Sequence, residues 1–329
     1  MKLKDHLRGR DMLLTKDWSI SEIDEVLLLA GKLKDMRRKG ISQRELLPGK
    51  TAFLIFFDKS TRTRNSFEAG LTQLGGHAHF IDIGSSQIAH GESPKDMGII
   101  LSGYGEAIAI RHDLVPGEGQ SYLREVAEHA TIPVFNMQCD IDHPFQMLAD
   151  LMTIREHFGS NTQGLKVAVT WAYAPSYAKP LSVPQGLLML LPRFGIDVTL
   201  AHPPEYELLP KAMQNAEEGA IQGGGKITRV DSMEDAVKNC QVVYAKSWGS
   251  ASLMHDPEQS LKTAKKYSAW RCDEKLMISA GKEAMYMHCL PADRGNEVTD
   301  EVLDGPRSLI YQEADNRLHT AKAVMAMTM

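Results

Sequence analysis

The 329-residue sequence predicts an α/β protein with two doubly wound domains, each built on a parallel sheet. Short apolar segments of strand length alternate with longer segments in which apolar residues recur at helical spacing. This alternation occurs in both halves of the chain, and polar side chains gather directly after several of the apolar segments. We expect a first domain at residues 1–152, with a final helix at 313–329 packed back on it, and a second domain at residues 153–312.

The expected strands are runs of apolar and aromatic residues. In the first domain they are residues 51–57, 77–83, 107–111 and 133–136. In the second domain they are residues 166–170, 197–201, 226–230, 241–245, 284–288 and 308–311. A helix at residues 144–158, with Met147, Leu151 and Ile154 at helical spacing, is expected to bridge the two domains. The cleft between domains is where we expect the ligand site.

The segment at residues 56–64 reads Phe-Phe-Asp-Lys-Ser-Thr-Arg-Thr-Arg, where the first expected strand gives way to a helix. The first turn of a helix offers backbone N–H groups and the positive end of the macrodipole, and both suit an anion. The hydroxyls and guanidinium groups of this segment add donors for phosphate oxygens. Arg62 and Arg64 cannot both point the same way, so one is expected to bind ligand and the other to brace the site. The alternative is a simple helix cap with solvated arginines.

Three further polar groups follow expected strands. They are Arg111, the segment His-Pro-Phe-Gln at residues 143–146, and the segment His-Cys-Leu-Pro at residues 288–291. Open α/β sheets bind ligands at the carboxyl ends of their strands, so these groups are expected to lie near one another. Each also has a structural explanation: a helix start for His143, a surface charge for Arg111, and a small buried residue for Cys289.

Ser-Thr-Arg-Thr-Arg, His-Pro-x-Gln and His-Cys-Leu-Pro, in this order and at these distances, resemble the aspartate/ornithine carbamoyltransferase family over nearly the whole chain. Residues 86–92 resemble the loop that a neighbouring subunit lends to the active site. Residues 313–319 resemble the family's final helix, whose arginine points into the carbamoyl phosphate pocket. The resemblance implies the carbamoyltransferase fold, a homotrimer and no cofactor or metal.

The resemblance also implies a set of carbamoyl phosphate ligands in this chain. They are Ser60, Thr61, Arg62, Thr63, Gln87, Arg111, His143, Gln146, Cys289, Leu290 and Arg317. Gln87 would act in trans from the adjacent subunit, and Leu290 would offer a backbone carbonyl to the carbamoyl nitrogen. Arg111, His143 and the Thr63 hydroxyl are the expected donors to the oxyanion that forms when an amine attacks the carbamoyl carbon. Cys289 is not assigned as a nucleophile, because no general base is evident for it.

The amine substrate is predicted to differ from that of ornithine-specific members, which resemble one another in an Asp-x-x-x-Ser-Met-Gly loop. Here residues 243–249 read Val-Tyr-Ala-Lys-Ser-Trp-Gly, and a lysine repels an ammonium group and attracts a carboxylate. We therefore expect a small, carboxylate-bearing amine. The residues expected to contact it are Trp171, Lys179, Lys246, Ser247 and Trp248. Ornithine or an acylated ornithine stays an alternative, as does a short diamino acid such as 2,3-diaminopropionate, in either direction of the reaction.

Residues 171–185 form a long segment with three prolines. It resembles the proline-containing loop of carbamoyltransferases that act on acylated ornithines, in which the chain passes through a loop to make a trefoil knot. Knots are rare, but this resemblance favours one in the second domain, and the chain is most similar to an uncharacterised knotted transcarbamylase group. The alternative is a long surface loop.

Composition limits the other classes of function. The net charge of −5, from 37 basic and 42 acidic residues, argues against a general nucleic-acid binder. Four cysteines without CxxC spacing, and no apolar run of membrane-spanning length, lead us to expect a cytoplasmic protein with no membrane partner. Two alternatives are a catalytically silent regulatory subunit that binds carbamoyl phosphate or another anion, and a nucleotide-binding α/β protein. The latter is disfavoured because no Gly-x-Gly-x-x-Gly follows a strand.

Overall fold

The computed structural model describes residues 5–113, 115–177 and 179–329, and they form two compact units. One unit extends to Ala149 and resumes at Asp315–Met329; the other is Asp150–Ala314. The chain passes from the first unit to the second within α5 (Pro144–Phe158) and returns within α12 (Ile310–Thr328). None of the helices in these described ranges is long and apolar enough to cross a bilayer.

The first unit contains a parallel sheet in the order β2-β1-β3-β4. Its strands are β1 (Thr51–Phe56), β2 (His77–Asp82), β3 (Ala107–His112) and β4 (Val134–Cys139). Its other helices are α1 (Ile20–Arg38), α2 (Arg62–Leu74), α3 (Pro94–Ser102) and α4 (Gly119–His129). Short 3-10 helices lie at Asp5–Leu7, Thr15–Asp17, Ile83–Ser85 and Gln87–His90. β1 and β4 are buried along nearly their whole length, as expected for strands of a parallel sheet covered on both faces.

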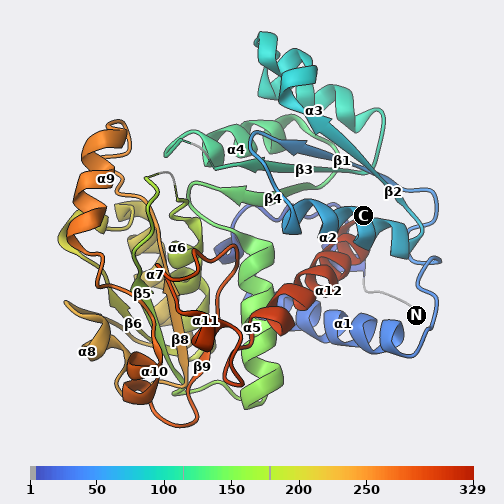
Figure 1. Ribbon diagram of the computed structural model, residues 1–329. Helices are drawn as coiled ribbons and strands as arrows, with labels where there is room; N and C mark the ends of the chain where they lie inside the picture. Colours follow the sequence, from blue (N-terminus) through green and yellow to red (C-terminus); the bar gives the residue numbers. More distant parts are fainter. Residues whose placement is uncertain (1–4, 114, 178) are drawn as a thin grey trace. The chain divides into compact units, whose positions relative to one another are not determined.

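The turn between α2 and β2 depends on a glycine. Gly75 has φ +99°, which L side chains rarely adopt, and a Cβ there would lie 2.0 Å from the carbonyl oxygen of Arg44. Gly75 therefore ends α2 as a left-handed cap and lets the chain enter β2. In the same unit, α12 lies beside α1 and α2 (Figure 1), where Lys34 donates to Asn316 and Lys322 donates to Gln73.

The second unit contains a parallel sheet in the order β7-β6-β5-β8-β9. Its strands are β5 (Lys166–Trp171), β6 (Asp197–Ala201), β7 (Ile227–Val230), β8 (Val242–Lys246) and β9 (Met285–Tyr286). Its helices are α6 (Ser182–Leu190), α7 (Pro210–Gly223), α8 (Met233–Val237), α9 (Pro257–Lys266), α10 (Glu274–Ala280) and α11 (Asp300–Leu303). Two 3-10 helices lie at Leu191–Phe194 and Pro204–Tyr206. The strand order changes direction at β5, between β6 and β8, which is where such sheets bind ligands.

One expected strand is wrong. Within the described ranges, residues 308–311 form no strand and make an isolated parallel bridge, between Ser308 and Tyr286. The N–H of Tyr286 donates to the carbonyl of Arg307, and the carbonyl of Tyr286 accepts from the N–H of Leu309. The helix α12 then begins at Ile310. The apolar residues at 308–311 therefore serve a helix start, because a short apolar run does not distinguish a strand from a buried helix turn.

Candidate active site

In the first unit, a buried arginine joins three helices. Arg317 on α12 donates from Nη2 to Oγ1 of Thr63 on α2 (2.7 Å) and from Nη1 to Oε1 of Gln146 on α5. All three side chains are buried. Thr63 uses its oxygen as the acceptor in this bond, so its hydroxyl hydrogen stays available to a ligand. The structure thus brings together three of the residues that the sequence placed in the phosphate pocket.

The two arginines of the 60–64 segment have different surroundings. Arg64 donates from Nε to Oε1 of Glu68 (2.7 Å) and its guanidinium lies 3.6 Å from the centre of the Phe80 ring. Arg64 is therefore the bracing arginine. Among the described residues, Thr61 makes no side-chain cap bond at the start of α2, and Ser60 accepts a long bond, 3.4 Å, from the N–H of Arg64. The simple helix-cap interpretation of this segment therefore receives little support.

Arg111 is held by a residue that the sequence did not single out. Its Nε and Nη2 donate to the two oxygens of Asp113, at 3.1 and 3.0 Å. The Asp113 side chain is 1% exposed and that of Arg111 is 14% exposed. Burial raises the pKa of Asp113, although Arg111 acts in the opposite direction. This bidentate pair fixes the guanidinium plane at the carboxyl end of β3, next to an irregularity in the pairing of β3 with β4.

His143 lies at the start of α5 and is positioned by a second unpredicted acid. Asp142 accepts from the backbone N–H of His143 (2.7 Å) and from both the backbone N–H and the hydroxyl of Thr15. Burial raises the pKa of Asp142 to about 6. These bonds fix the backbone at His143, which is itself buried.

Gln87, the residue expected to act in trans, lies on a different segment from Arg111, His143 and Arg317. It belongs to the 3-10 helix at Gln87–His90, and its side chain is exposed.

In the second unit, two of the predicted amine-binding residues, Lys179 and Ser247, contact a buried carboxylate. Glu297 accepts from the backbone N–H groups of Ser247 and Asp293, and it lies 3.5 Å from Nζ of Lys179. Lys179 also pairs with Asp293, at 2.7 Å. Burial alone would raise the pKa of Glu297, but His288, Lys179 and Lys246 lower it well below its usual range. Glu297 is therefore an anion at neutral pH, and no motif in the sequence pointed to it.

Lys246, at the end of β8, is buried and donates from Nζ to the carbonyl of Ser247 (2.6 Å). Burial lowers the pKa of Lys246, while Cys289 and Glu297 nearby act in the opposite direction. An ammonium group in this position is stabilised by any further anion that reaches it. The Ser247 hydroxyl, also buried, has no hydrogen-bond partner among the residues the structure describes.

The two tryptophans of the predicted amine site use their indole N–H groups to hold loops together. Trp171 donates to the carbonyl of Trp248 (2.9 Å), and Trp248 donates to the carbonyl of Tyr206 (2.8 Å). Each of the two tryptophans is buried, with 1% exposed. The two tryptophans shape the carboxyl ends of β5 and β8. Their indole N–H groups already donate to backbone carbonyls.

The His-Cys-Leu-Pro turn is fixed by hydrogen bonds at both ends. Nδ1 of His288 accepts from the N–H of Leu290 (2.9 Å), so the ring carries its proton on Nε2, which faces Glu297 at 3.4 Å. The backbone N–H of His288 donates to Glu313 (2.9 Å). Leu290 has φ +56°, a conformation that is uncommon for a branched residue and is often kept at functional sites. Among the described residues, no three metal-ligating side chains gather at one place.

Two family models match the chain. Residues 10–156 match the aspartate/ornithine carbamoyltransferase carbamoyl-P binding domain, and residues 179–328 match the Asp/Orn binding domain. The chain belongs to the aspartate/ornithine carbamoyltransferase family. Membership confirms the resemblance drawn from the three motifs and favours a carbamoyltransferase over a nucleotide-binding protein.

Relatives and solved structures of carbamoyltransferases cover nearly the whole chain. The chain is 41% identical to "Putative carbamoyltransferase YgeW" of Escherichia coli (strain K12), over 95% of this chain and 88% of that protein. It is 38% identical to the ornithine carbamoyltransferase of Carboxydothermus hydrogenoformans, over 97% of both chains. A solved acetylornithine transcarbamylase, complexed with acetylcitrulline, superposes with a TM-score of 0.88 at 32% identity, over 96% of this chain and 98% of the other. These matches confirm two parallel-sheet α/β domains of the transcarbamylase fold.

Proposed function

We propose that the protein transfers the carbamoyl group of carbamoyl phosphate to the amine of a small substrate and releases phosphate, or catalyses the reverse phosphorolysis. The observation that carries this proposal is the buried network of Arg317, Thr63 and Gln146, which directs a cation and a hydroxyl to the start of α2. The first domain, residues 1–152 with the helix at 313–329, would bind carbamoyl phosphate. Residues 153–312 would bind the amine. No metal or cofactor is required for this chemistry.

The phosphate would be held at the first turn of α2. Ser60, Thr61, Arg62 and Thr63 would donate to its oxygens, together with backbone N–H groups and the helix dipole. Gln146 and Arg317 would complete the pocket on the carbamoyl side. From the 288–291 turn, Leu290 would accept from the carbamoyl nitrogen, with Cys289 beside it. The family match to a carbamoyl-P binding domain over residues 10–156 supports this assignment.

The transition state would be stabilised by fixed donors. As a neutral amine attacks the carbamoyl carbon, the C–O bond to phosphate breaks and negative charge develops on the carbonyl oxygen. Arg111, His143 and the Thr63 hydroxyl would donate to that oxygen, and Asp113 prevents Arg111 from turning away. The departing phosphate would accept the amine proton, so no covalent enzyme intermediate is needed.

The amine would carry a carboxylate that binds Lys246. Lys179 already pairs with Asp293 and Glu297, so its charge is compensated within the second unit. Lys246 is buried and donates to a neutral carbonyl, so a substrate carboxylate would offset the cost of burying its charge. Trp171, Ser247 and Trp248 would shape the site, with the Ser247 hydroxyl as a further donor. Ornithine or an acylated ornithine is the alternative, since relatives named for ornithine are 38% identical.

The test is phosphate release from carbamoyl phosphate with a panel of amines: ornithine, N-acylated ornithines, putrescine, aspartate and short diamino acids. We expect release with a carboxylate-bearing amine and a matching carbamoylated product. Replacement of Lys246 by Met is expected to raise KM for that amine at least tenfold while carbamoyl phosphate binding is retained. Efficient turnover of putrescine, which has no carboxylate, would contradict the assignment of Lys246.

The second candidate function is a catalytically silent regulatory subunit that binds carbamoyl phosphate or another anion. Such a subunit would need the phosphate-binding groups alone. His143→Ala separates the two. In an enzyme, turnover should fall by about 100-fold or more, because one oxyanion donor is lost, while carbamoyl phosphate binding weakens far less. A wild-type protein that binds carbamoyl phosphate and releases no phosphate with any amine of the panel favours the regulatory subunit.

We further propose that the segment 171–185 forms a trefoil knot with the rest of the second domain. Residue 178 of this segment lies outside the described residues. The backbone N–H of Gly249 donates to the carbonyl of Lys179 (2.8 Å), so the chain at Lys179 packs closely against Gly249. A Cβ on Gly249 would lie 2.7 Å from the carbonyl oxygen of Tyr177, so the approach requires glycine. A crystal structure traced through both segments would show whether the chain threads the loop.

A homotrimer in which Gln87 acts on the neighbouring subunit's ligand is also proposed. The exposure of Gln87 in its own protomer supports it, because a side chain that serves a neighbouring site must be reachable from outside. A cytoplasmic location is proposed as well, and it is supported by the four cysteines, all of which carry free thiols.

A further inference from the structure

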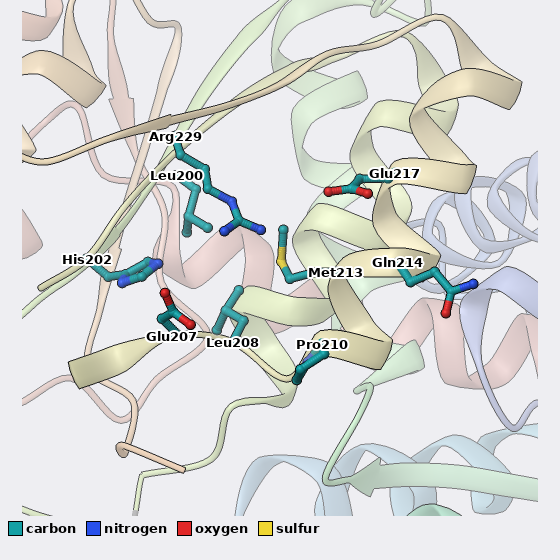
Figure 2. Close-up of a pocket in the computed structure, with 9 residues that line it drawn as sticks. All are labelled: Leu200, His202, Glu207, Leu208, Pro210, Met213, Gln214, Glu217 and Arg229. Atoms are coloured by element: carbon teal, nitrogen blue, oxygen red, sulfur yellow. The ribbon is translucent and has the colours of Figure 1, made fainter. Parts of the chain in front are cut away.

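A cavity of about 310 Å³ lies wholly within the second unit, at the carboxyl ends of β6 and β7 and beside the first turns of α7. Figure 2 shows its lining. The lining residues are Leu200, His202, Glu207, Leu208, Pro210, Met213, Gln214, Glu217 and Arg229. None of them belongs to the residues proposed to bind carbamoyl phosphate or the amine. The cavity is therefore a separate feature, and its volume suits a small ligand.

The floor of this cavity is apolar. Leu200, Leu208 and Met213 are buried residues whose side chains line it. Together with Pro210 they offer a surface for an aliphatic chain of a few carbon atoms. Gln214 lies at the rim, and Figure 2 shows its amide directed away from the cavity.

The wall carries three charged groups of both signs. The guanidinium of Arg229 is directed into the cavity, the carboxylate of Glu217 faces it from α7, and the carboxylate of Glu207 lies near the ring of His202 (Figure 2). Within the part of the chain that the structure describes, the side chains of these three residues make no hydrogen bond or ion pair. One cation and two carboxylates give the wall a net charge of −1.

His202 adds a defined polar atom. Its Nδ1 lies 2.9 Å from the carbonyl oxygen of Pro203, and since a carbonyl can only accept, Nδ1 carries the proton. In the neutral ring, Nε2 is therefore an acceptor. The same ring contacts Trp248 edge-to-face, with ring centres 6.3 Å apart. The cavity wall is thus in contact with the loop proposed to bind the amine.

We propose that this cavity is a second binding site, for an α-amino acid whose side chain ends in a second amine. Its carboxylate would pair with Arg229, its two ammonium groups with Glu207 and Glu217, and its methylenes would cover Leu200, Leu208 and Met213. The net charge of such a ligand, +1, complements the −1 of the wall. A free phosphate or dicarboxylate would be repelled by the two glutamates, and a simple diamine would leave Arg229 unpaired.

The proposal is tested by isothermal titration calorimetry of the full-length protein with L-lysine as the probe. We expect saturable binding that Arg229→Ala and Glu217→Gln each weaken roughly tenfold or more, the effect of losing one charge-assisted contact. Cadaverine lacks the carboxylate and norleucine lacks the second amine. The wild-type protein is expected to bind each of them at least as weakly as the two variants bind lysine. The matched control is Glu218→Gln, one residue along α7 and outside the cavity lining, which should bind lysine as the wild type does.

The proposed amine site is excluded as the source of binding by Lys246→Met, which should retain lysine affinity, because Lys246 is the residue proposed to bind the carboxylate of the amine substrate. Phosphate release without lysine should be unchanged in Arg229→Ala and Glu217→Gln. The proposal is overturned if the wild type shows no saturable lysine binding, if Arg229→Ala binds lysine as tightly as the wild type, or if Lys246→Met abolishes lysine binding. These outcomes do not depend on whether the carbamoyl transfer proposal holds.

Discussion

At the residue scale, burial decides what an arginine–carboxylate pair does. Arg64 and Glu68 pair on α2 with side chains that are 38% and 33% exposed, so water and salt screen their charges. Arg111 and Asp113 make a bidentate pair with a 1% exposed carboxylate. A buried pair of this geometry holds the guanidinium in one orientation, because any other leaves a buried charge without its partner.

Asp113→Asn is expected to lower carbamoyl transfer about 10- to 100-fold, since a misplaced catalytic group costs about that much. Asn keeps one acceptor oxygen, and its amide N–H₂ faces the guanidinium, so Arg111 loses its fixed orientation. Steady-state kinetics would show a higher KM for carbamoyl phosphate and a lower kcat. Asp235→Asn, which breaks the exposed pair of Asp235 with Lys238 in the second unit, is the control and should change kcat by less than about twofold. Wild-type kinetics in Asp113→Asn would refute the positioning role.

At the element scale, α12 organises the first unit. It supplies Arg317 to α2 and α5, Asn316 to Lys34 of α1, and Lys322 to Gln73 of α2. Most of this helix is buried, so its polar side chains must find partners inside the protein. The helix that carries Arg317, proposed to complete the phosphate pocket, therefore also places a lysine in a poorly hydrated position.

Lys322 makes the stability of the protein depend on pH. Burial, aided by Arg37, lowers its pKa from 10.5 to about 8. Below pH 8 the folded state bears the full cost of the buried charge. Between pH 8 and 10.5 the folded state releases the proton while the unfolded state keeps it, so the unfolded state binds more protons and this contribution to stability rises with pH.

Lys322→Met is therefore expected to be more stable than the wild type at pH 7, by about 2 kcal/mol. Urea unfolding at pH 7 and pH 10 measures the difference, which should shrink at the higher pH. Lys39→Met removes an exposed lysine just after α1 that pairs with Asp35, and at pH 7 it should change stability by less than about 0.5 kcal/mol. A difference that stays constant between the two pH values would mean that the Lys322 charge does not limit stability.

At the scale of the whole molecule, the chain forms two compact units that are joined within two helices, α5 and α12. Each unit holds part of the proposed site: Thr63, His143, Gln146 and Arg317 in the first, and Lys179, Lys246 and the 288–291 turn in the second. Under the proposed function, Gln87 adds a contribution from a further protomer. The complete site then requires both units and an oligomer.

Mixing two inactive variants tests the oligomer. Under the proposed action in trans, Arg62 and Gln87 of one site come from two different protomers, so trimers mixed from Arg62→Ala and Gln87→Ala chains should contain intact sites. Random reassembly after mild denaturation should restore about one quarter of wild-type activity, since half of the protomers carry Arg62 and half of their neighbours carry Gln87. Arg62→Ala mixed with His143→Ala is the control and should restore none. No recovery with Gln87→Ala, or a fully active monomer in light scattering, would contradict action in trans.

The sequence by itself determined the fold class and the places of the three family motifs, because strand and helix periodicity and local motifs depend on residues close in the chain. It also indicated that only one of Arg62 and Arg64 can bind ligand. The tertiary structure alone decided what those groups contact. Arg317 and Thr63 are 254 residues apart, and Ser247 and Glu297 are 50 apart. Asp113, Asp142 and Glu297 have no motif of their own, because a buried carboxylate acquires its role only from the donors that folding brings to it.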